Sequence, residues 1–317
     1  MQGRMKASRD KGNHPLNQAP PLPEVEKARA GVNGEVEIAY QEFGNPEDPV
    51  LVLVPGLGTQ LLYWDEQFCD MLVERGFRVI RMENRDSGAS TVLEELGPPD
   101  STALFLGLRR GLRYGMEDMA DDLIYLLDHL GVERAHFAGS SMGGMVVQTV
   151  AIRNPERVSS LCSIMSRTGA RADAFPAPRQ ARALLRPRPD DLDEFIAHVE
   201  MLARTLGSTV YPPDPERVRR LATIAWRRGI HPEGTARQLH AVNTQADRTK
   251  ALGRVRAPTL VIHGAADRLV FPRGGRRTAE AIPNARLRIY EGMAHDVPEQ
   301  LWPQFAAEME ANAHRQV

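Results

Sequence analysis

The clearest chemical signal in the sequence is a serine flanked by glycines. Gly139-Ser140-Ser141-Met142-Gly143 has the form G-x-S-x-G and continues the small apolar run 135–139. In a tight turn from a strand into a helix there is no room for Cβ atoms two positions either side of the central residue, so glycine is needed there. Such a turn lifts the central hydroxyl above a sheet and points a helix N-terminus at negative charge. We therefore predict that Ser141 is a nucleophile, with Ser140 one position out of register.

A serine nucleophile needs a base to take its proton and an acid to orient that base. In a strand-turn-helix arrangement of this kind the partners follow in the order serine, acid, histidine. Asp267 comes just after the apolar run 259–262, and His295 comes just after the run 287–290. Active sites of parallel sheets form at the carboxyl ends of the strands, where these loops would meet. The predicted triad is Ser141, Asp267 and His295.

Other residues near the predicted triad have simpler explanations. His263 still belongs to a strand end, which favours a buried structural role, and His314 lies near the end of the chain, where fraying favours a solvated role. Asp296 is adjacent to His295, which makes a bond between the two side chains awkward. We expect Asp296 to cap the helix that begins near Pro298.

A glycine-containing loop could stabilise the oxyanion that forms when a serine attacks a carbonyl. Val54-Pro55-Gly56-Leu57-Gly58 follows the apolar run 50–54, and its glycines allow backbone N–H groups to face the site. We assign the two donors to the amides of Leu57 and Met142, the latter being the residue after the nucleophile. Losing one such donor typically costs about 10²–10³ in kcat.

The elements that would position these residues alternate between strand and helix. The expected strands span 35–40, 50–54, 77–81, 135–139, 158–165, 258–263 and 286–290, and the expected helices span 61–75, 116–130, 142–153 and the C-terminal segment. This alternation predicts an α/β fold with a mostly parallel sheet flanked by helices. Residues 31–166 and 251–317 would form its core.

The segment 167–250 interrupts the alternation. It is rich in arginine and proline, has a helical pattern without a clear core strand, and holds 15 basic against 10 acidic residues. We interpret it as an inserted helical cap that covers the triad and sets substrate choice. Its positive charge is explained either by a solvated surface or by attraction of anionic substrates.

Composition narrows the class of protein. With 40 Lys and Arg against 41 Asp and Glu, the chain lacks the basic excess of nucleic-acid-binding proteins. There is no apolar run of the roughly 20 residues that span a bilayer and no signal-peptide pattern, so we expect a cytoplasmic protein without an integral membrane segment. Cys69 and Cys162 are too few for a disulfide scaffold or a cysteine zinc site. Residues 1–30 read as a flexible tail; the alternative is an arm that packs on a partner subunit in a homodimer.

Several segments resemble the α/β-hydrolase family from about Gly34 onward, and more narrowly a bacterial esterase/lipase group related to aclacinomycin methyl esterase. The segments that carry this resemblance are 55–60, 79–90, 116–122 and 295–298. The resemblance implies the α/β-hydrolase fold with a cap, the triad Ser141, Asp267 and His295, and the oxyanion amides of Leu57 and Met142. Pro55, where many relatives have histidine, and Ala294, where glycine is frequent, depart from the family pattern without removing a reacting group.

The function predicted from these residues is hydrolysis of small carboxylic esters through an acyl-enzyme, with no metal and no organic cofactor. A thioesterase, a C–C hydrolase or a cofactor-free perhydrolase would use the same triad, and a ligand-binding member of the fold without catalysis is the alternative from another class. Trp64 and Met145 are candidate substrate-binding residues, with core packing as the alternative for Met145.

Overall fold

The computed structural model describes residues 21–31 and 34–315, and these form one eight-stranded sheet in the order β1-β2-β4-β3-β5-β6-β7-β8. The strands are β1 Glu26–Ala30, β2 Val36–Phe43, β3 Val50–Val54, β4 Arg78–Met82, β5 Ala135–Ser140, β6 Val158–Ile164, β7 Thr259–Gly264 and β8 Arg286–Tyr290. Strand β2 is antiparallel to both of its neighbours, β1 and β4, and strands β3 to β8 run parallel to one another. The predicted α/β fold is confirmed. The loops that follow the parallel strands all leave from the same side of the sheet, at the carboxyl ends of the strands.

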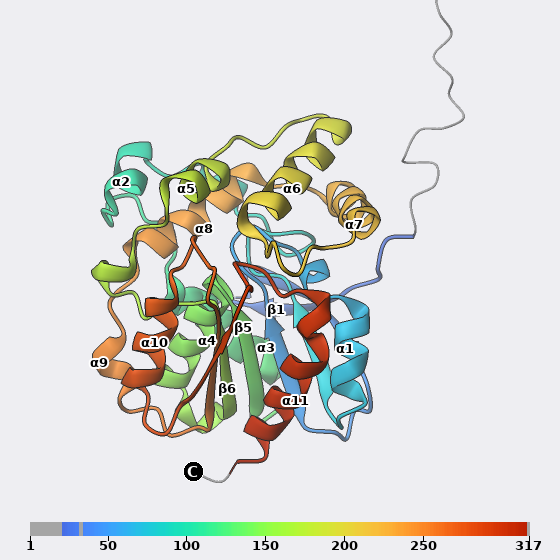
Figure 1. The fold of residues 1–317 in the computed structure, drawn as a ribbon, viewed down its shortest axis with the longest axis vertical. Helices are drawn as coiled ribbons and strands as arrows, with labels where there is room; N and C mark the ends of the chain where they lie inside the picture. Colours follow the sequence, from blue (N-terminus) through green and yellow to red (C-terminus); the bar gives the residue numbers. More distant parts are fainter. Residues whose placement is uncertain (1–20, 32–33, 316–317) are drawn as a thin grey trace, which may run out of the picture.

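Helices cover both faces of this sheet (Figure 1). On one face α1 Glu66–Val73 packs beside α11 Trp302–Ala313, and on the other face α3 Met116–His129 and α4 Met142–Arg153 pack together, with α10 Pro272–Ala281 against β7 and β8. Each face has its own apolar cluster. Strand β3 is buried along its whole length because it lies between these two clusters.

A helical insertion lies between β6 and β7 and covers the edge of the sheet at the top of Figure 1. It contains α5 Pro178–Leu184, α6 Leu192–Leu206, α7 Pro215–Arg228, α8 Pro232–Thr244 and α9 Thr249–Leu252. We call this insertion the cap. No described helix is long and apolar enough to cross a membrane.

Two buried ion pairs join the cap to the loop after β4. Arg228 of α7 contacts Glu83 at 2.7 Å, and Arg237 of α8 contacts Asp86 at 2.6 Å. All four side chains are almost fully buried. Removing one member of such a pair leaves an uncompensated buried charge, which typically costs about 3–5 kcal/mol. The cap is therefore anchored to the core by polar contacts as well as by packing.

Three expectations need correction. Residues 26–30 are not part of a tail but form β1, in which the small side chains Ala28 and Ala30 face the core; residues 1–20 lie outside the described residues. The helix expected at 61–75 is a 3₁₀ turn at Leu61–Tyr63 followed by α1. The loop after β4 also contains an unpredicted helix, α2 Ser101–Leu106, which packs against α8.

Candidate active site

Ser141 lies at the turn between β5 and α4 in a strained backbone conformation, with φ of +52°. Both glycines of the motif stand where a side chain could not fit. A Cβ atom on Gly139 would lie 2.3 Å from the carbonyl oxygen of Gly143, and one on Gly143 would lie 2.3 Å from that of Val54. Glycine is therefore required at both positions by lack of space, as predicted from the sequence. The tight turn brings the N-terminus of α4 against the end of β3.

Three side chains from separate loops meet at this turn. His295 lies after β8 with its Nε2 3.0 Å from Ser141 Oγ, and its Nδ1 is 2.7 Å from Oδ2 of Asp267, which follows β7. With Nδ1–H donating to the carboxylate, Nε2 is left as the acceptor for the serine hydroxyl. The structure thus brings together the serine, histidine and aspartate that the sequence analysis selected.

Asp267 is fully buried and well supplied with donors. Its Oδ1 accepts hydrogen bonds from the amides of Leu269 and Val270 at 2.8 and 2.9 Å. Burial alone would raise the pKa of Asp267, but the charge of His295 and hydrogen bonds from His263 and His295 outweigh it and hold that pKa well below its usual range. His263 is completely buried and contacts the carbonyl oxygen of Val270 at 2.8 Å. This position matches the structural role expected for His263.

The loop after β3 lies beside the serine. The Cβ position of Gly56 is 3.5 Å from Cβ of Ser141, so Leu57 follows at the same site. Met142 is the first residue of α4, where backbone N–H groups have no partner within the helix. Neither the Leu57 amide nor the Met142 amide donates to another of the residues described. Both are available to a ligand, as an oxyanion hole requires.

Two cap side chains hold Gly58, the neighbour of Leu57, from opposite sides. The amide of Gly58 donates to Oε1 of Gln238 in α8 at 2.8 Å, and its carbonyl accepts from Nη2 of Arg188, between α5 and α6, at 3.1 Å. Gln238 is fully buried, and its amide group donates to the Arg85 carbonyl and to Ser87 Oγ. The cap therefore fixes the shape of the loop that carries Leu57.

The cap also holds the loop that carries His295. The amide of His295 donates to the carbonyl of Leu206 at 2.9 Å, and Oγ of Ser208 accepts from the amide of Ala294 at 2.8 Å. The Ser208 hydroxyl and amide donate to the carboxylate of Asp296. Asp296 was expected to cap a helix; it instead ties the histidine loop to the segment after α6, a contact across 88 residues.

Trp64 and Met145 both lie in the core. Trp64 is 1% exposed and stacks on Phe68, and Met145 is 2% exposed within the cluster on the α4 face. Neither lines a cavity described below. Core packing, the alternative weighed for Met145, accounts for both positions.

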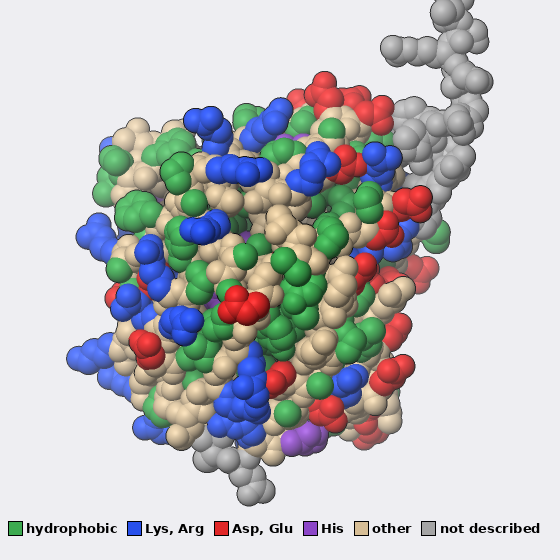
Figure 2. Space-filling model, viewed as in Figure 1, with side chains coloured by type: hydrophobic (Ala, Val, Ile, Leu, Met, Phe, Trp, Pro, Cys, Tyr) green, Lys and Arg blue, Asp and Glu red, His purple; other side chains and the backbone are tan. Residues whose placement is uncertain are grey.

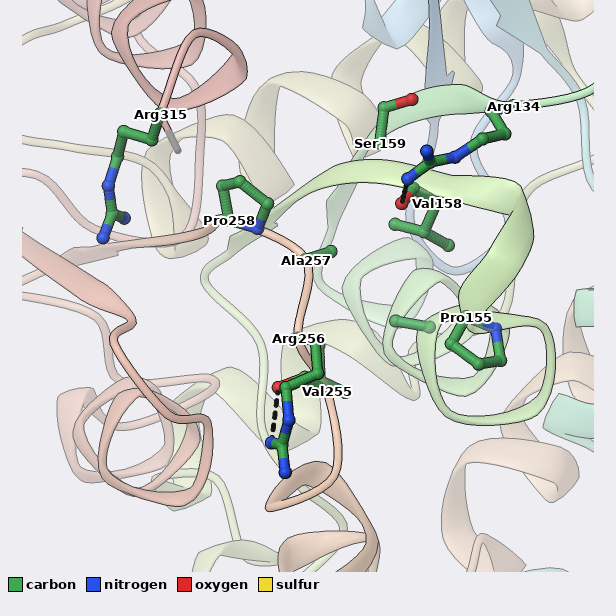
Figure 3. Close-up of a pocket in the computed structure, with 10 residues that line it drawn as sticks. Arg134, Pro155, Val158, Ser159, Val255, Arg256, Ala257, Pro258 and Arg315 are labelled. Atoms are coloured by element: carbon green, nitrogen blue, oxygen red, sulfur yellow. Dashed lines mark hydrogen bonds between the residues drawn. The ribbon is translucent and has the colours of Figure 1, made fainter. Parts of the chain in front are cut away.

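Two cavities lie at opposite ends of the parallel strands. One, about 310 Å³, is formed where β6 and β7 begin, and Figure 3 shows Arg134, Val158, Arg256 and Pro258 around it. Since β6 is parallel to its neighbours, this end is the one away from Ser141, and the cavity holds none of the predicted site residues. The other cavity, about 250 Å³, lies between Gly58, Tyr63 and the cap, next to the loop after β3.

Comparison with known proteins agrees with this geometry. The family model described as alpha/beta hydrolase fold matches residues 49–300. The chain belongs to the α/β-hydrolase family. It is 27% identical to a rhodomycin D methylesterase, DnrP, of Streptomyces peucetius, over 84% of this chain and 91% of that protein, and 30% identical to 3-oxoadipate enol-lactonase 2 of Acinetobacter baylyi, over 81% and 86%. The crystal structure of a hydrolase from Pseudomonas aeruginosa PA01 has a TM-score of 0.66 at 28% identity, covering 91% and 96% of the two chains.

The resemblance found in the sequence is thus confirmed for this α/β hydrolase, including its relationship to methylesterases. Gln238, Arg188 and Ser208 were not predicted from the sequence. No local pattern marks them, because each contacts a loop that is between 86 and 180 residues away.

Proposed function

We propose that this α/β hydrolase cleaves carboxylic esters of small molecules through an acyl-enzyme on Ser141. The observation that carries the proposal is the unbroken chain of hydrogen bonds from Ser141 Oγ through His295 to Asp267. His295 takes the proton of the serine hydroxyl as Oγ attacks the ester carbonyl, and then gives it to the leaving alcohol. Water enters by the same route and releases the acid.

The remaining parts of the site fit the charges of this reaction. Asp267 stays ionised because its pKa is held low, so it orients the imidazole and stabilises the imidazolium that forms. The amides of Leu57 and Met142 meet the oxyanion of the tetrahedral intermediate. Every step uses groups of the chain itself and water.

Relatives of this chain are named for several reactions, among them a carbamate hydrolase and a 2-hydroxy-6-oxononadienedioate hydrolase, and two relatives named for ester cleavage support the proposal. One is a methylesterase and another a lactonase, and a lactone is a cyclic ester. Ligand binding without turnover is disfavoured by the aligned triad and by two unpartnered amides beside it.

Hydrolysis of p-nitrophenyl acetate and butyrate by the purified protein tests the proposal, with Ser141→Ala beside Ser140→Ala. Ser140 is a matched control because it is a buried serine adjacent to Ser141, and the hydrogen bond to His295 is made by Ser141. We expect turnover by the wild type and by Ser140→Ala and its loss in Ser141→Ala. Equal activity of the two variants, or no turnover of any ester by the wild type, would overturn the assignment.

A further inference from the structure

The cavity beside the oxyanion loop combines apolar walls with a small set of nitrogen-bearing side chains. Apolar walls come from Leu62, Phe195, Val199, Leu202, Leu221 and Ile230. Arg188, His198 and His231 also line it, and Asp86 is its only acidic residue. A pocket of this kind holds an apolar chain and fixes its orientation through a few polar contacts.

Arg188 is a partly buried cation without an anionic partner. Its one hydrogen bond goes to the carbonyl of Gly58, and no carboxylate within the described part of the chain lies at ion-pair distance from it. Burial lowers the pKa of Arg188, and no neighbouring carboxylate opposes that effect. Buried charges in proteins are normally paired, since an unpaired one is costly. A ligand anion would supply the missing partner.

His198 provides a second, independent sign of a ligand in the same cavity. Its side chain is only 6% exposed, and its Nδ1 is buried without a partner among the described residues. Burial lowers the pKa of His198, and the positive charges of Arg188 and Arg186 lower it further. A neutral imidazole beside a guanidinium can donate a second hydrogen bond to an anion.

The other charged and imidazole side chains of the lining are already engaged. Arg237 and Tyr114 bind both carboxylate oxygens of Asp86, and His231 Nε2 contacts the carbonyl of Gly88. Among the cationic and imidazole groups of the described residues, Arg188 and His198 are therefore those left for an anion, and the Tyr63 hydroxyl lies in the same lining. Figure 2 shows basic side chains over α5 to α7 with acidic ones beside them at the start of α6, so the surface above this site carries both charges.

We propose that Arg188 and His198 bind a carboxylate at the far end of the substrate, so that the preferred ester is a half ester of a dicarboxylic acid. This rests on the proposed function. The Cβ position of Gly56 is 3.5 Å from Ser141 Cβ, and that of Gly58 is 2.6 Å from Arg188 Nη2. Two residues span at most about 7 Å, so the guanidinium lies within about 13 Å of the nucleophile. An acyl chain of roughly six to eight carbons bridges that distance through the apolar cavity.

Matched substrates test the proposal in the wild-type protein. Monomethyl half esters of the C6 and C8 dicarboxylic acids are compared with the corresponding methyl ester amides, which have the same shape without the charge. We expect kcat/KM to favour the half esters by about tenfold or more, the range of a charge-assisted contact. A ratio near one for the wild type would overturn the proposal.

Variants locate the contact. Arg188→Met should abolish the preference and Arg188→Lys should keep part of it, whereas Arg186→Met, an exposed change of the same charge nearby, should leave it intact. Because Arg188 also holds Gly58, its loss should lower the rates of both substrates, so the ratio is the readout. If Arg186→Met removes the preference as fully as Arg188→Met does, the preference comes from the general positive charge of the cap, and the assignment of a carboxylate site to Arg188 is wrong. His198→Phe should lower the ratio several-fold and serves if Arg188→Met does not fold.

Binding separates failure of this proposal from failure of the esterase assignment. In calorimetry, Ser141→Ala should bind the half ester with a lower Kd than the ester amide. With Arg188→Met added to Ser141→Ala, the two compounds should have equal Kd values. Tight binding of the half ester without hydrolysis by the wild type would leave the anion site standing and remove the esterase. Hydrolysis of both esters by the wild type without any difference in binding would support the esterase and rule out the anion site.

Discussion

Gln238 of helix α8 accepts a hydrogen bond from the amide of Gly58 at 2.8 Å, across 180 residues of sequence. Gly58 adjoins Leu57, whose own amide we assign to the oxyanion hole. A cap residue thus sets the geometry of a loop in the core, and this cap has two kinds of residue: those that line the cavity and those that hold reacting loops in place.

Replacing Gln238 with alanine should lower kcat for every ester, small or large, by about tenfold or more. The Gly58 amide loses its acceptor, and the displaced Leu57 amide stabilises the oxyanion less well, an effect bounded by the 10²–10³ for a lost donor. Steady-state kinetics with p-nitrophenyl acetate measures it. Asn243→Ala, an exposed change on the same helix, is the control. Unchanged kcat in Gln238→Ala would show that the loop holds its shape without the cap.

Cavity-lining residues of the cap should act on substrate choice instead. Leu202→Phe fills space in the cavity and should lower kcat/KM for p-nitrophenyl octanoate about tenfold while leaving the acetate unchanged, since a pocket contact is worth about 1–3 kcal/mol of discrimination. Leu185→Phe, at an exposed cap position, should change neither. Equal losses for the two esters would mean that the cavity does not receive the acyl chain.

The sequence predicted those parts of the site that depend on local backbone geometry. Glycines at 139 and 143 are required by the turn itself, and Asp267 and His295 follow strands that end at the same edge. Strand β1 was missed because Ala28 and Ala30 are too small to give an apolar signal between charged neighbours. The sequence does not reveal that Tyr63 lines the cavity and Trp64 does not, because the 3₁₀ turn at 61–63 decides which of the two aromatic residues faces it. Contacts of Gln238 and Ser208 depend on how the cap folds back, which no short pattern records.

The pH dependence of activity should follow a single ionisation on the acid side. His295 must be neutral to accept the proton of Ser141, so kcat/KM should rise as the imidazole loses its proton and then level off. Asp267 adds no second step between about pH 5 and 9, because its lowered pKa keeps the carboxylate ionised over that range. Measurements of kcat/KM for a neutral ester from about pH 5 to 9 test this. A maximum in mildly acidic buffer with decline by neutrality would remove His295 from the role of base.

Stability should fall in mild acid because of His136 in β5. Burial lowers its pKa to about 4, with the positive charges of His314 and Arg134 adding to the effect. In the unfolded chain histidine titrates near 6.5, so between about pH 6.5 and 4 the unfolded state binds more protons and the free energy of unfolding decreases, by about 2 kcal/mol. Urea unfolding of the wild type and of His136→Asn at about pH 7.5 and 4.5 measures it. The variant should lose less stability on acidification, and identical losses would contradict the assignment to His136.

Trapping the acyl-enzyme tests the central claim most directly. Protein mixed with excess p-nitrophenyl butyrate and quenched in acid within milliseconds should gain the mass of one butyryl group, and peptide mapping should locate it on Ser141. Ser140→Ala should acylate as the wild type does, and Ser141→Ala should gain no mass and lose turnover by up to about 10⁶, as in comparable triads. A butyryl group on another residue, or undiminished acylation of Ser141→Ala, would contradict the account.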